Sequence, residues 1–334
     1  MRGVDRRSEL KRWIETRLNV SPLALEPASA DASFRRYFRV RTADGSLIAM
    51  DAPPAHEDCR PFVRVARLMA EAGLNVPRVI AEDFERGFLL LSDLGTANYL
   101  QALNGDTADG LFGDAIDALL RWQLASKPGV LPPYDEALLR RELNLFPEWY
   151  VGRHYAISLD AGQNQALAAV FALILKCNLA QPAVYVHRDY MPRNLMVCEP
   201  NPGVLDFQDA VYGPITYDVA SLFKDAFISW DEERVLDWTA RYWEKAKRAG
   251  LPVAADFGEF YRDFEWMGLQ RHLKVLGIFA RLNYRDGKSG YLEDTPRFVG
   301  YVRTVAARYG AFKPLLTLLD EIEGRAAADV GYTF

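Results

Sequence analysis

Four polar residues have types and spacing that could do chemistry. His187, Asp189 and Asn194 follow the pattern H-x-D-x(4)-N, and Asp206 comes twelve residues after Asn194. Carboxylate and amide oxygens are hard ligands that suit Mg²⁺, and Mg²⁺ held by few protein ligands keeps positions open for phosphate oxygens. A carboxylate that binds no metal can accept a hydroxyl proton. The pattern therefore predicts phosphoryl transfer, which needs positioning, charge neutralisation and one base.

A β-hairpin is expected to bring these residues together. The turn-forming sequence Pro200-Asn201-Pro202-Gly203 separates segments 195–197 and 204–207, which we predict to pair as strands. Pairing about this turn places Asn194 and Asp206 at the open end of the hairpin, with Asp189 just upstream. Taken singly, each of these residues is as easily a turn residue or a core histidine. The combination favours function.

The first ninety or so residues predict a small antiparallel β lobe. Hydrophobic periodicity and turn signals indicate helices at 8–18 and 57–72 and strands at 33–41, 46–50, 79–84 and 87–92, with Asp44-Gly45 as a hairpin turn.

From about residue 96 the periodicity becomes helical. Helices are predicted at 111–125, 135–146, 165–179, 230–249, 257–283 and 301–321, interrupted by a strand at 184–187 and the hairpin. The predicted fold class is therefore α+β, with an N-terminal lobe at 1–95 and a larger helical lobe at 96–334.

The composition excludes several classes of protein. The chain has 40 basic and 45 acidic residues and a net charge of −5, so a nucleic-acid partner is not expected. Its three cysteines lie far apart, which argues against disulfides or a zinc site. No apolar run reaches the ~20 residues of a membrane span, and the first residues lack a signal-peptide pattern. We expect a cytoplasmic protein without a membrane partner.

The segment 187–194, followed by Asp206-Phe207, resembles the catalytic loop and metal-binding aspartate of the aminoglycoside phosphotransferase and choline kinase family. The resemblance covers most of the chain and implies a two-lobed, protein-kinase-like fold that uses ATP and Mg²⁺. It implies that Asp189 is the catalytic base, that Asn194 and Asp206 hold Mg²⁺, and that His187 orients the loop.

Two further segments resemble parts of this family. Residues 90–95 look like the hinge between the lobes, whose backbone binds adenine, and so Ser92, Asp93 and Leu94 are predicted to contact the nucleotide. Asp218 resembles an aspartate that steadies the catalytic loop. A simple cap of the helix that follows is an equal alternative for Asp218.

The sequence departs from the family where a lysine usually holds the nucleotide phosphates. The corresponding strand reads Ile-Ala-Met-Asp at 48–51, and no lysine occurs between Arg12 and Ser126. The segment 29–33 replaces a glycine-rich loop, and Ser33 could donate to phosphate. An arginine must therefore supply the cation, and the candidates are Arg35, Arg36, Arg39 and Arg193.

Several segments resemble one branch of the family, the bacterial kinases that phosphorylate the anomeric hydroxyl of N-acetylmuramate and N-acetylglucosamine in cell-wall recycling. These are segments 31–39, 50–54, 142–150, 205–210 and 270–274. The resemblance implies an amino-sugar substrate and a sugar 1-phosphate product. Side chains suited to a sugar and its carboxylate are Glu142, Trp149, Asp209 and Arg271, although helix packing explains Trp149 equally well and an ion pair explains Arg271.

Other functions stay open at this point. The same fold could phosphorylate choline, ethanolamine, an aminoglycoside or homoserine, and acidic residues 231–233 beside Trp230 leave a cationic substrate open. A nucleotide-binding pseudokinase would explain the missing lysine, but Asp189, Asn194 and Asp206 are all present. We expect a monomer.

Overall fold

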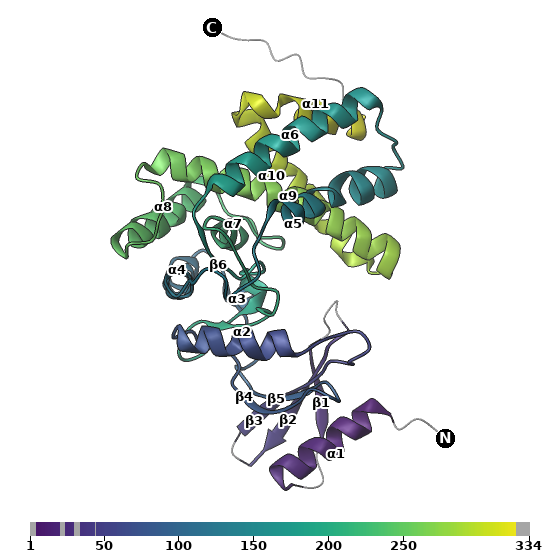
Figure 1. The fold of residues 1–334 in the computed structure, drawn as a ribbon, viewed down its shortest axis with the longest axis vertical. Coiled ribbons are helices and arrows are strands. Elements are labelled where there is room, and N and C mark those ends of the chain that lie inside the picture. Colours follow the sequence, from purple (N-terminus) through teal and green to yellow (C-terminus); the bar gives the residue numbers. More distant parts are fainter. Residues whose placement is uncertain (1–4, 21–23, 30–33, 44, 325–334) are drawn as a thin grey trace. The chain divides into compact units, whose positions relative to one another are not determined.

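The structure, a computed structural model, describes residues 5–20, 24–29, 34–43 and 45–324 (Figure 1). It contains two compact units, each built from two stretches of chain. The first unit comprises residues 1–122 and 192–210, and the second comprises residues 123–191 and 211–334. The predicted lobe boundary after residue 95 lies within the first unit, and the division into functional lobes at that point stays a prediction.

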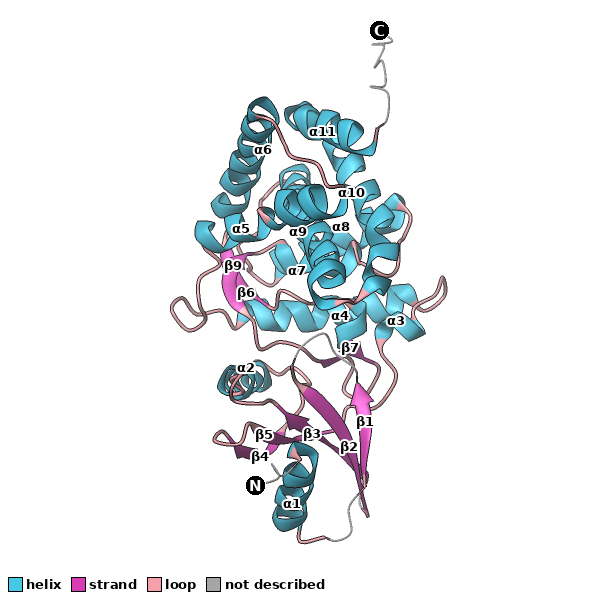
Figure 2. Cartoon of the chain, turned by 90° about the vertical axis from the view of Figure 1, so that its right-hand side faces the viewer, coloured by secondary structure: helices cyan, strands magenta, loops and turns pink. Residues whose placement is uncertain are grey.

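The first unit is built on an antiparallel sheet of five strands in the order β1-β2-β3-β5-β4 (Figure 2). The strands are β1 (Leu25–Ser29), β2 (Arg36–Thr42), β3 (Gly45–Asp51), β4 (Val79–Asp83) and β5 (Phe88–Ser92). Strand β1 was not predicted, because Pro27 interrupts its pattern. A proline is tolerated here since β1 is an edge strand.

Strand alternation gives the sheet two different faces. Phe38 and Val40 of β2 and Phe88 and Leu90 of β5 pack against helix α1 (Arg6–Leu18) in one hydrophobic core. Helix α2 (Arg60–Glu71) covers the opposite face (Figures 1 and 2). Helix α2 begins three residues later than predicted and has a proline in its first turn, where a missing N–H costs nothing.

The predicted hairpin completes the first unit. It consists of β7 (Leu195–Met196) and β8 (Gly203–Val204) and follows the 3₁₀ turn η2 (Pro192–Asn194). It attaches to the rest of the unit through bridges from Asn75 to Gly203 and from Asn98 to Met196. Helices α3 (Tyr99–Ala102) and α4 (Ala108–Leu124) follow the sheet in sequence.

The second unit is mostly helical. Its helices are α5 (Glu136–Leu143), the π-helix η1 (Phe146–His154), α6 (Ala161–Ala180), α7 (Tyr217–Phe223), α8 (Glu232–Arg248), α9 (Phe257–Asp286), the 3₁₀ helix η3 (Ser289–Asp294), α10 (Thr295–Arg308), the 3₁₀ helix η4 (Gly310–Phe312) and α11 (Lys313–Glu323). Its two strands, β6 (Ala183–Val186) and β9 (Val211–Pro214), pair antiparallel.

Two predicted helices are interrupted in the structure. The helix predicted at 301–321 is divided into α10 and α11, because Gly310 and Pro314 favour an ending and a new first turn there. The helix predicted at 135–146 ends at Leu143, and the chain continues as the π-helix η1. Both breaks matter less for the site than the pairing of β6 with β9, which fixes the start of the catalytic loop.

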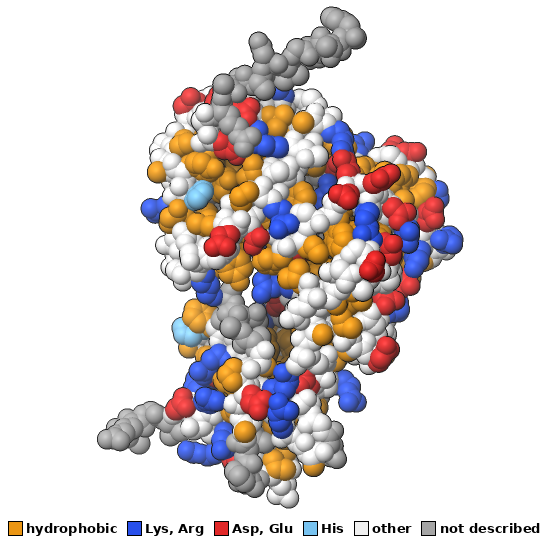
Figure 3. Space-filling view, turned by 180° about the vertical axis from the view of Figure 1, so that it is seen from behind, with side chains coloured by type: hydrophobic (Ala, Val, Ile, Leu, Met, Phe, Trp, Pro, Cys, Tyr) orange, Lys and Arg blue, Asp and Glu red, His pale blue; other side chains and the backbone are white. Residues whose placement is uncertain are grey.

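The surface carries mixed charge. On the face shown in Figure 3, basic and acidic side chains are interspersed over the helical unit, in keeping with the balanced composition. Among the described residues, no helix has both the length and the apolar character that crossing a bilayer demands.

Candidate active site

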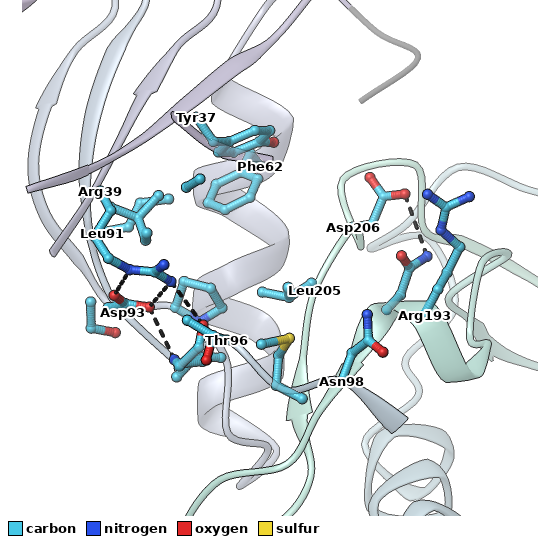
Figure 4. Close-up of a pocket in the computed structure, with 18 residues that line it drawn as sticks. Tyr37, Arg39, Phe62, Leu91, Asp93, Thr96, Asn98, Arg193, Leu205 and Asp206 are labelled. Carbon is cyan, nitrogen blue, oxygen red and sulfur yellow. Dashed lines mark hydrogen bonds and ion pairs between the residues drawn. The ribbon is translucent and has the colours of Figure 1, made fainter. Parts of the chain in front are cut away.

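A cavity of about 300 Å³ opens within the first unit (Figure 4). One side is formed by the sheet and helix α2, and the other by the hairpin segment. Its apolar lining includes Tyr37, Ile48, Phe62, Leu91, Met196 and Leu205, and its polar lining includes Ser92, Asp93, Asn98, Arg193, Asn194 and Asp206. Apolar walls with a few convergent polar groups are typical of a small-molecule site.

The predicted hinge residues Ser92, Asp93 and Leu94 all line this cavity. The Asp93 carboxylate accepts hydrogen bonds from Arg39 at 2.5 and 3.1 Å, from Ser46 at 2.7 Å and from the Gly95 amide at 3.0 Å. Burial opposes ionisation of Asp93, but these partners outweigh it and lower its pKa. The Asp93 side chain therefore braces the hinge, and what this segment offers a ligand is its backbone.

The arginines of β2 lie on opposite faces of the sheet. Arg36 binds the fully buried Asp51 through its Nε at 3.2 Å, and Asp51 also binds Arg6. Tyr37 and Arg39 point to the cavity, and Arg39 donates to Asp93 and to the Gly95 carbonyl at 2.9 Å. Arg36 is not among the cavity-lining residues, so its predicted contact with nucleotide stays a prediction without support from this geometry.

Arg35 immediately precedes β2. Strand alternation places it in the row of Tyr37 and Arg39 on the cavity side. Burial opposes its charge, but the negative potential of its neighbours, among them Asp206 and Asp209, outweighs this and raises its pKa. Ser33, the predicted phosphate contact, lies outside the described residues.

The hairpin brings the predicted metal ligands together. Leu195 pairs with Val204, and the Leu205 amide donates to the Asn194 carbonyl at 2.9 Å. In consequence the Asn194 amide group lies 3.5 Å from an Asp206 carboxylate oxygen. The pairing predicted from the turn sequence is thus present, although β8 is shorter than predicted.

Asp206 is held in an uncommon backbone conformation. Its φ of +62° lies in the left-handed region, which turns the chain out of β8. The next residue, Phe207, is buried and packs on Phe62 of α2 with ring centroids 4.8 Å apart. Gln208 donates to the Asp206 carboxylate at 2.9 Å. Packing on one side and a hydrogen bond on the other fix this carboxylate beside the cavity.

The donor set at the hairpin fits Mg²⁺. One carboxylate and one amide oxygen supply hard oxygen ligands in the small number that this ion takes from proteins. Among the described residues, no group of three or more His, Cys, Asp or Glu side chains could hold a metal.

The first part of the catalytic loop, residues 187–191, belongs to the second unit and is held by Asp218. Its buried carboxylate accepts the amides of His187 at 2.7 Å and Arg188 at 3.0 Å. The Asp189 amide in turn donates to the His187 ring at 3.2 Å. Asp218 stands inside α7 and does not cap it, since Thr216 is the N-cap residue. Of the two alternatives for Asp218, the structure supports the steadying of the loop.

The carboxyl of Asp218 has a pKa far above that of an ordinary aspartate. Burial, reinforced by the Asp189 carboxylate, raises the pKa of Asp218 to about 7, although the two amide hydrogen bonds and Arg271 oppose this shift. The group that clamps the loop therefore titrates near physiological pH.

The four predicted sugar contacts lie in different surroundings. Glu142 is buried on α5, where it binds Arg188 and Lys274. Arg271 is buried on α9, where its guanidinium donates to the Lys224 carbonyl at 3.5 Å. Trp149 is half-buried on η1, and Asp209 is exposed next to Gln208. Contact with sugar stays a prediction for all four.

Sequence reasoning missed most of the apolar cavity wall. The sequence did not predict that Ile48, Leu91, Met196 and Leu205 line the site, although their alternation with core-facing neighbours was a usable signal. Lys274, which contacts Glu142, gave no local signal because the two residues lie far apart in the chain.

Comparison with known proteins identifies a phosphotransferase family, as the motifs of the sequence do. Residues 24–257 match the model of the phosphotransferase enzyme family. An N-acetylmuramate/N-acetylglucosamine kinase of Pseudomonas putida is 53% identical over 333 residues, 97% of this chain and 98% of its own. Kinases with the same name are 56% identical in Pseudomonas aeruginosa, over 91% of this chain and 88% of their own, and 49% identical in Neisseria meningitidis, over 99% and 100%.

Solved structures show the same fold. A choline/ethanolamine kinase family protein from Mesorhizobium loti superposes with a TM-score of 0.63 at 14% identity, covering 95% of this chain and all of its own. The ADP-bound aminoglycoside phosphotransferase APH(2'')-Ib gives 0.56 at 12% identity, covering 89% and 98%. The predicted fold class is confirmed. From the family match and its identity to these relatives, the chain belongs to the phosphotransferase enzyme family.

Proposed function

We propose that this protein is an ATP-dependent kinase that phosphorylates the anomeric hydroxyl of N-acetylmuramate or N-acetylglucosamine and yields the sugar 1-phosphate. The observation that carries the proposal is the hairpin, which places Asn194 and Asp206 together beside an apolar cavity with a hinge backbone. The substrate class rests on the relatives that bear these sugars in their names.

The nucleotide half of the site is assigned to the first unit. The adenine would lie between the apolar residues Ile48 and Leu205, with the backbone of residues 92–95 supplying hydrogen bonds. Asn194 and Asp206 would hold Mg²⁺, which when bound neutralises phosphate charge. Ser92 lies at this wall, with its hydroxyl accepting the Arg78 amide at 2.9 Å.

The cation on the phosphates is assigned to Arg193 and Arg35. Arg193 lines the cavity, and Arg35 feels the negative potential of Asp206. Arg36 lies on the other face of the sheet from the cavity, and Arg39 holds the carboxylate of the hinge residue Asp93. The missing lysine is thereby compatible with an active kinase.

The acceptor chemistry is assigned to the catalytic loop and to the predicted sugar contacts. Asp189 would accept the proton of the anomeric hydroxyl, which is more acidic than an ordinary alcohol, so a modest base suffices. His187 keeps the loop in shape through its bond to the Asp189 amide. Trp149 and Asp209, each at least partly exposed, are the predicted sugar contacts best placed to meet a ligand.

The proposal places the enzyme in peptidoglycan recycling. A kinase that consumes ATP and a free amino sugar fits the cytoplasm, and we propose that it works as a monomer with small-molecule partners only.

Phosphorus NMR tests this function directly. Purified protein with Mg²⁺-ATP is incubated in parallel with N-acetylmuramate, N-acetylglucosamine and choline. We expect a new phosphomonoester signal coupled to the anomeric proton in the sugar samples and none with choline. Asp189→Asn should abolish transfer while Mg²⁺-ADP binding persists. A signal with choline alone would refute the substrate, and full turnover by Asp189→Asn would refute the base.

A further inference from the structure

A cluster of charged and tyrosine side chains includes Arg188 of the catalytic loop and lies entirely within the second unit. We call it the buried hub, and it consists of Tyr134, Glu142, Arg188, Tyr217 and Lys274. Each residue comes from a different segment: the loop before α5, α5 itself, the catalytic loop, α7 and α9. The proposed reaction uses none of these five side chains.

Glu142 is the centre of the hub. One of its carboxylate oxygens lies 2.5 Å from Arg188 and 3.1 Å from Lys274, and the other accepts from the Tyr134 hydroxyl. The Glu142 side chain is only 6% exposed. Burial favours its neutral form, but Lys274 and Arg188 outweigh this and lower its pKa. Glu142 is therefore an ionised carboxylate whose oxygens are already occupied by protein donors.

Lys274 and the two tyrosines complete the enclosure. Lys274 donates to the Tyr217 hydroxyl at 3.0 Å, and the Arg188 guanidinium lies 5.5 Å from the centre of the Tyr134 ring. Tyr134 itself is fixed against β9 through Gly213, where a Cβ would lie 2.5 Å from the Tyr134 Cβ. The hub is thus attached to helices α7 and α9 and to strand β9.

Arg188 has an uncommon backbone conformation, and both its amide and its side chain are bound by carboxylates. Its φ of +77° lies in the left-handed region, which residues other than glycine seldom adopt. Asp218 holds its amide at 3.0 Å, and Glu142 holds its side chain. Because Arg188 immediately precedes Asp189, the conformation imposed on Arg188 sets the direction in which the Asp189 carboxylate leaves the backbone.

We propose that Glu142 is a positioning residue for the catalytic base: it fixes Arg188, and through Arg188 it aims Asp189. The inference rests on the proposed function for the role of Asp189. It replaces the expectation that Glu142 contacts the sugar, since a buried carboxylate that already binds two cations and a tyrosine has little left to offer a ligand.

The test compares kinetic constants of two variants and one control. Glu142→Gln keeps the shape of the side chain but leaves Arg188 and Lys274 as two cations without a carboxylate. We expect kcat to fall about a hundredfold, as misplacement of a catalytic group does, with KM for ATP and for sugar unchanged. Adding Lys274→Met removes the surplus cation, so the double variant should recover at least about tenfold of the lost kcat.

The control is Arg303→Gln. Arg303 also binds two carboxylates, Asp320 at 2.7 Å and Glu323 at 2.8 Å, and its side chain is 20% exposed, like that of Arg188. It links α10 to α11, far in the sequence from the catalytic loop. Arg303→Gln should lower Tm and leave kcat unchanged.

Three results would overturn the inference. Glu142→Gln could keep full kcat with a lower Tm, which would make the hub merely structural. It could raise KM for sugar at constant kcat, which would make Glu142 a substrate contact. The double variant could fail to regain kcat over the single variant. Mg²⁺-ADP binding reports folding of each variant, and Asp189→Asn in the same assay reports separately on the proposed function.

Discussion

Three buried aspartates show how partners decide the role of one residue type. Asp51 is bound by Arg6 and Arg36, and Asp93 by Arg39, so both are structural anchors in the first unit. Asp218 receives two backbone amides instead of a cation partner. Amide bonds offset less of the burial cost than a guanidinium does. Burial therefore raises the pKa of Asp218 to about 7, whereas the partners of Asp93, Arg39 among them, lower the pKa of that carboxyl.

This difference gives a pH dependence of stability. The pKa of Asp218 is higher in the folded protein than the 3.8 of an ordinary aspartate, so the folded state binds the extra proton. Its contribution to the free energy of unfolding must therefore fall as pH rises from about 4 to about 7. The variant Asp218→Asn lacks this pH-dependent contribution to the free energy of unfolding. We expect the stability of wild type relative to the variant to decline over that window in urea unfolding.

Wild type and Asp218→Asn share every other titrating group, so the comparison isolates Asp218. A stability difference that stays constant or grows with pH would contradict the assignment. The variant should also lose much of kcat at every pH, because an amide side chain cannot accept from both loop amides.

At the scale of elements, helix α9 illustrates how close packing fixes the second unit. Gly277 of α9 faces the segment before η1, where an added Cβ would lie 2.4 Å from the backbone of Leu145. The backbone of Leu145 cannot yield as a side chain would. The approach of these two elements therefore depends on the absence of a side chain at 277.

Gly277→Ala should destabilise the protein by about 1–3 kcal/mol, the usual cost of overpacking. The matched control is Gly300→Ala in α10, where nothing lies within 4 Å of the added Cβ. Alanine favours a helix interior, so the control should gain about 0.5–1 kcal/mol. Equal effects of the two substitutions on the urea midpoint would argue against the close approach.

The elements that the sequence predicted well are those with local signals. The turn at 200–203 located the hairpin, and from it the neighbouring positions of Asn194 and Asp206. The opposite faces of Arg36 and Arg39 were also readable from alternation, yet both were kept as phosphate candidates. The pairing of β6 with β9 and the contact of Glu142 with Lys274 were beyond reach, because both join segments far apart in the chain.

At the scale of the molecule, the proposed nucleotide site belongs to one unit alone. Every residue that lines the cavity lies within 1–122 or 192–210. Mg²⁺-ADP without sugar should therefore protect amides of these two stretches from hydrogen exchange and leave most of α6 and α11 unchanged. At a hundred times the Kd, binding should stabilise the protein by about 2.7 kcal/mol. Protection centred on the second unit would refute the nucleotide assignment.

The discontinuity of the two units has a consequence for synthesis on the ribosome. The sheet of the first unit is complete once β5 has emerged, but the hairpin that bridges to Asn75 and Asn98 is translated only after segment 123–191. At about 5–20 residues per second that interval lasts on the order of several seconds. During it the nascent sheet exists without the strand pair that carries the proposed metal ligands, so under the proposed function the nucleotide site is complete only after the hairpin has been made.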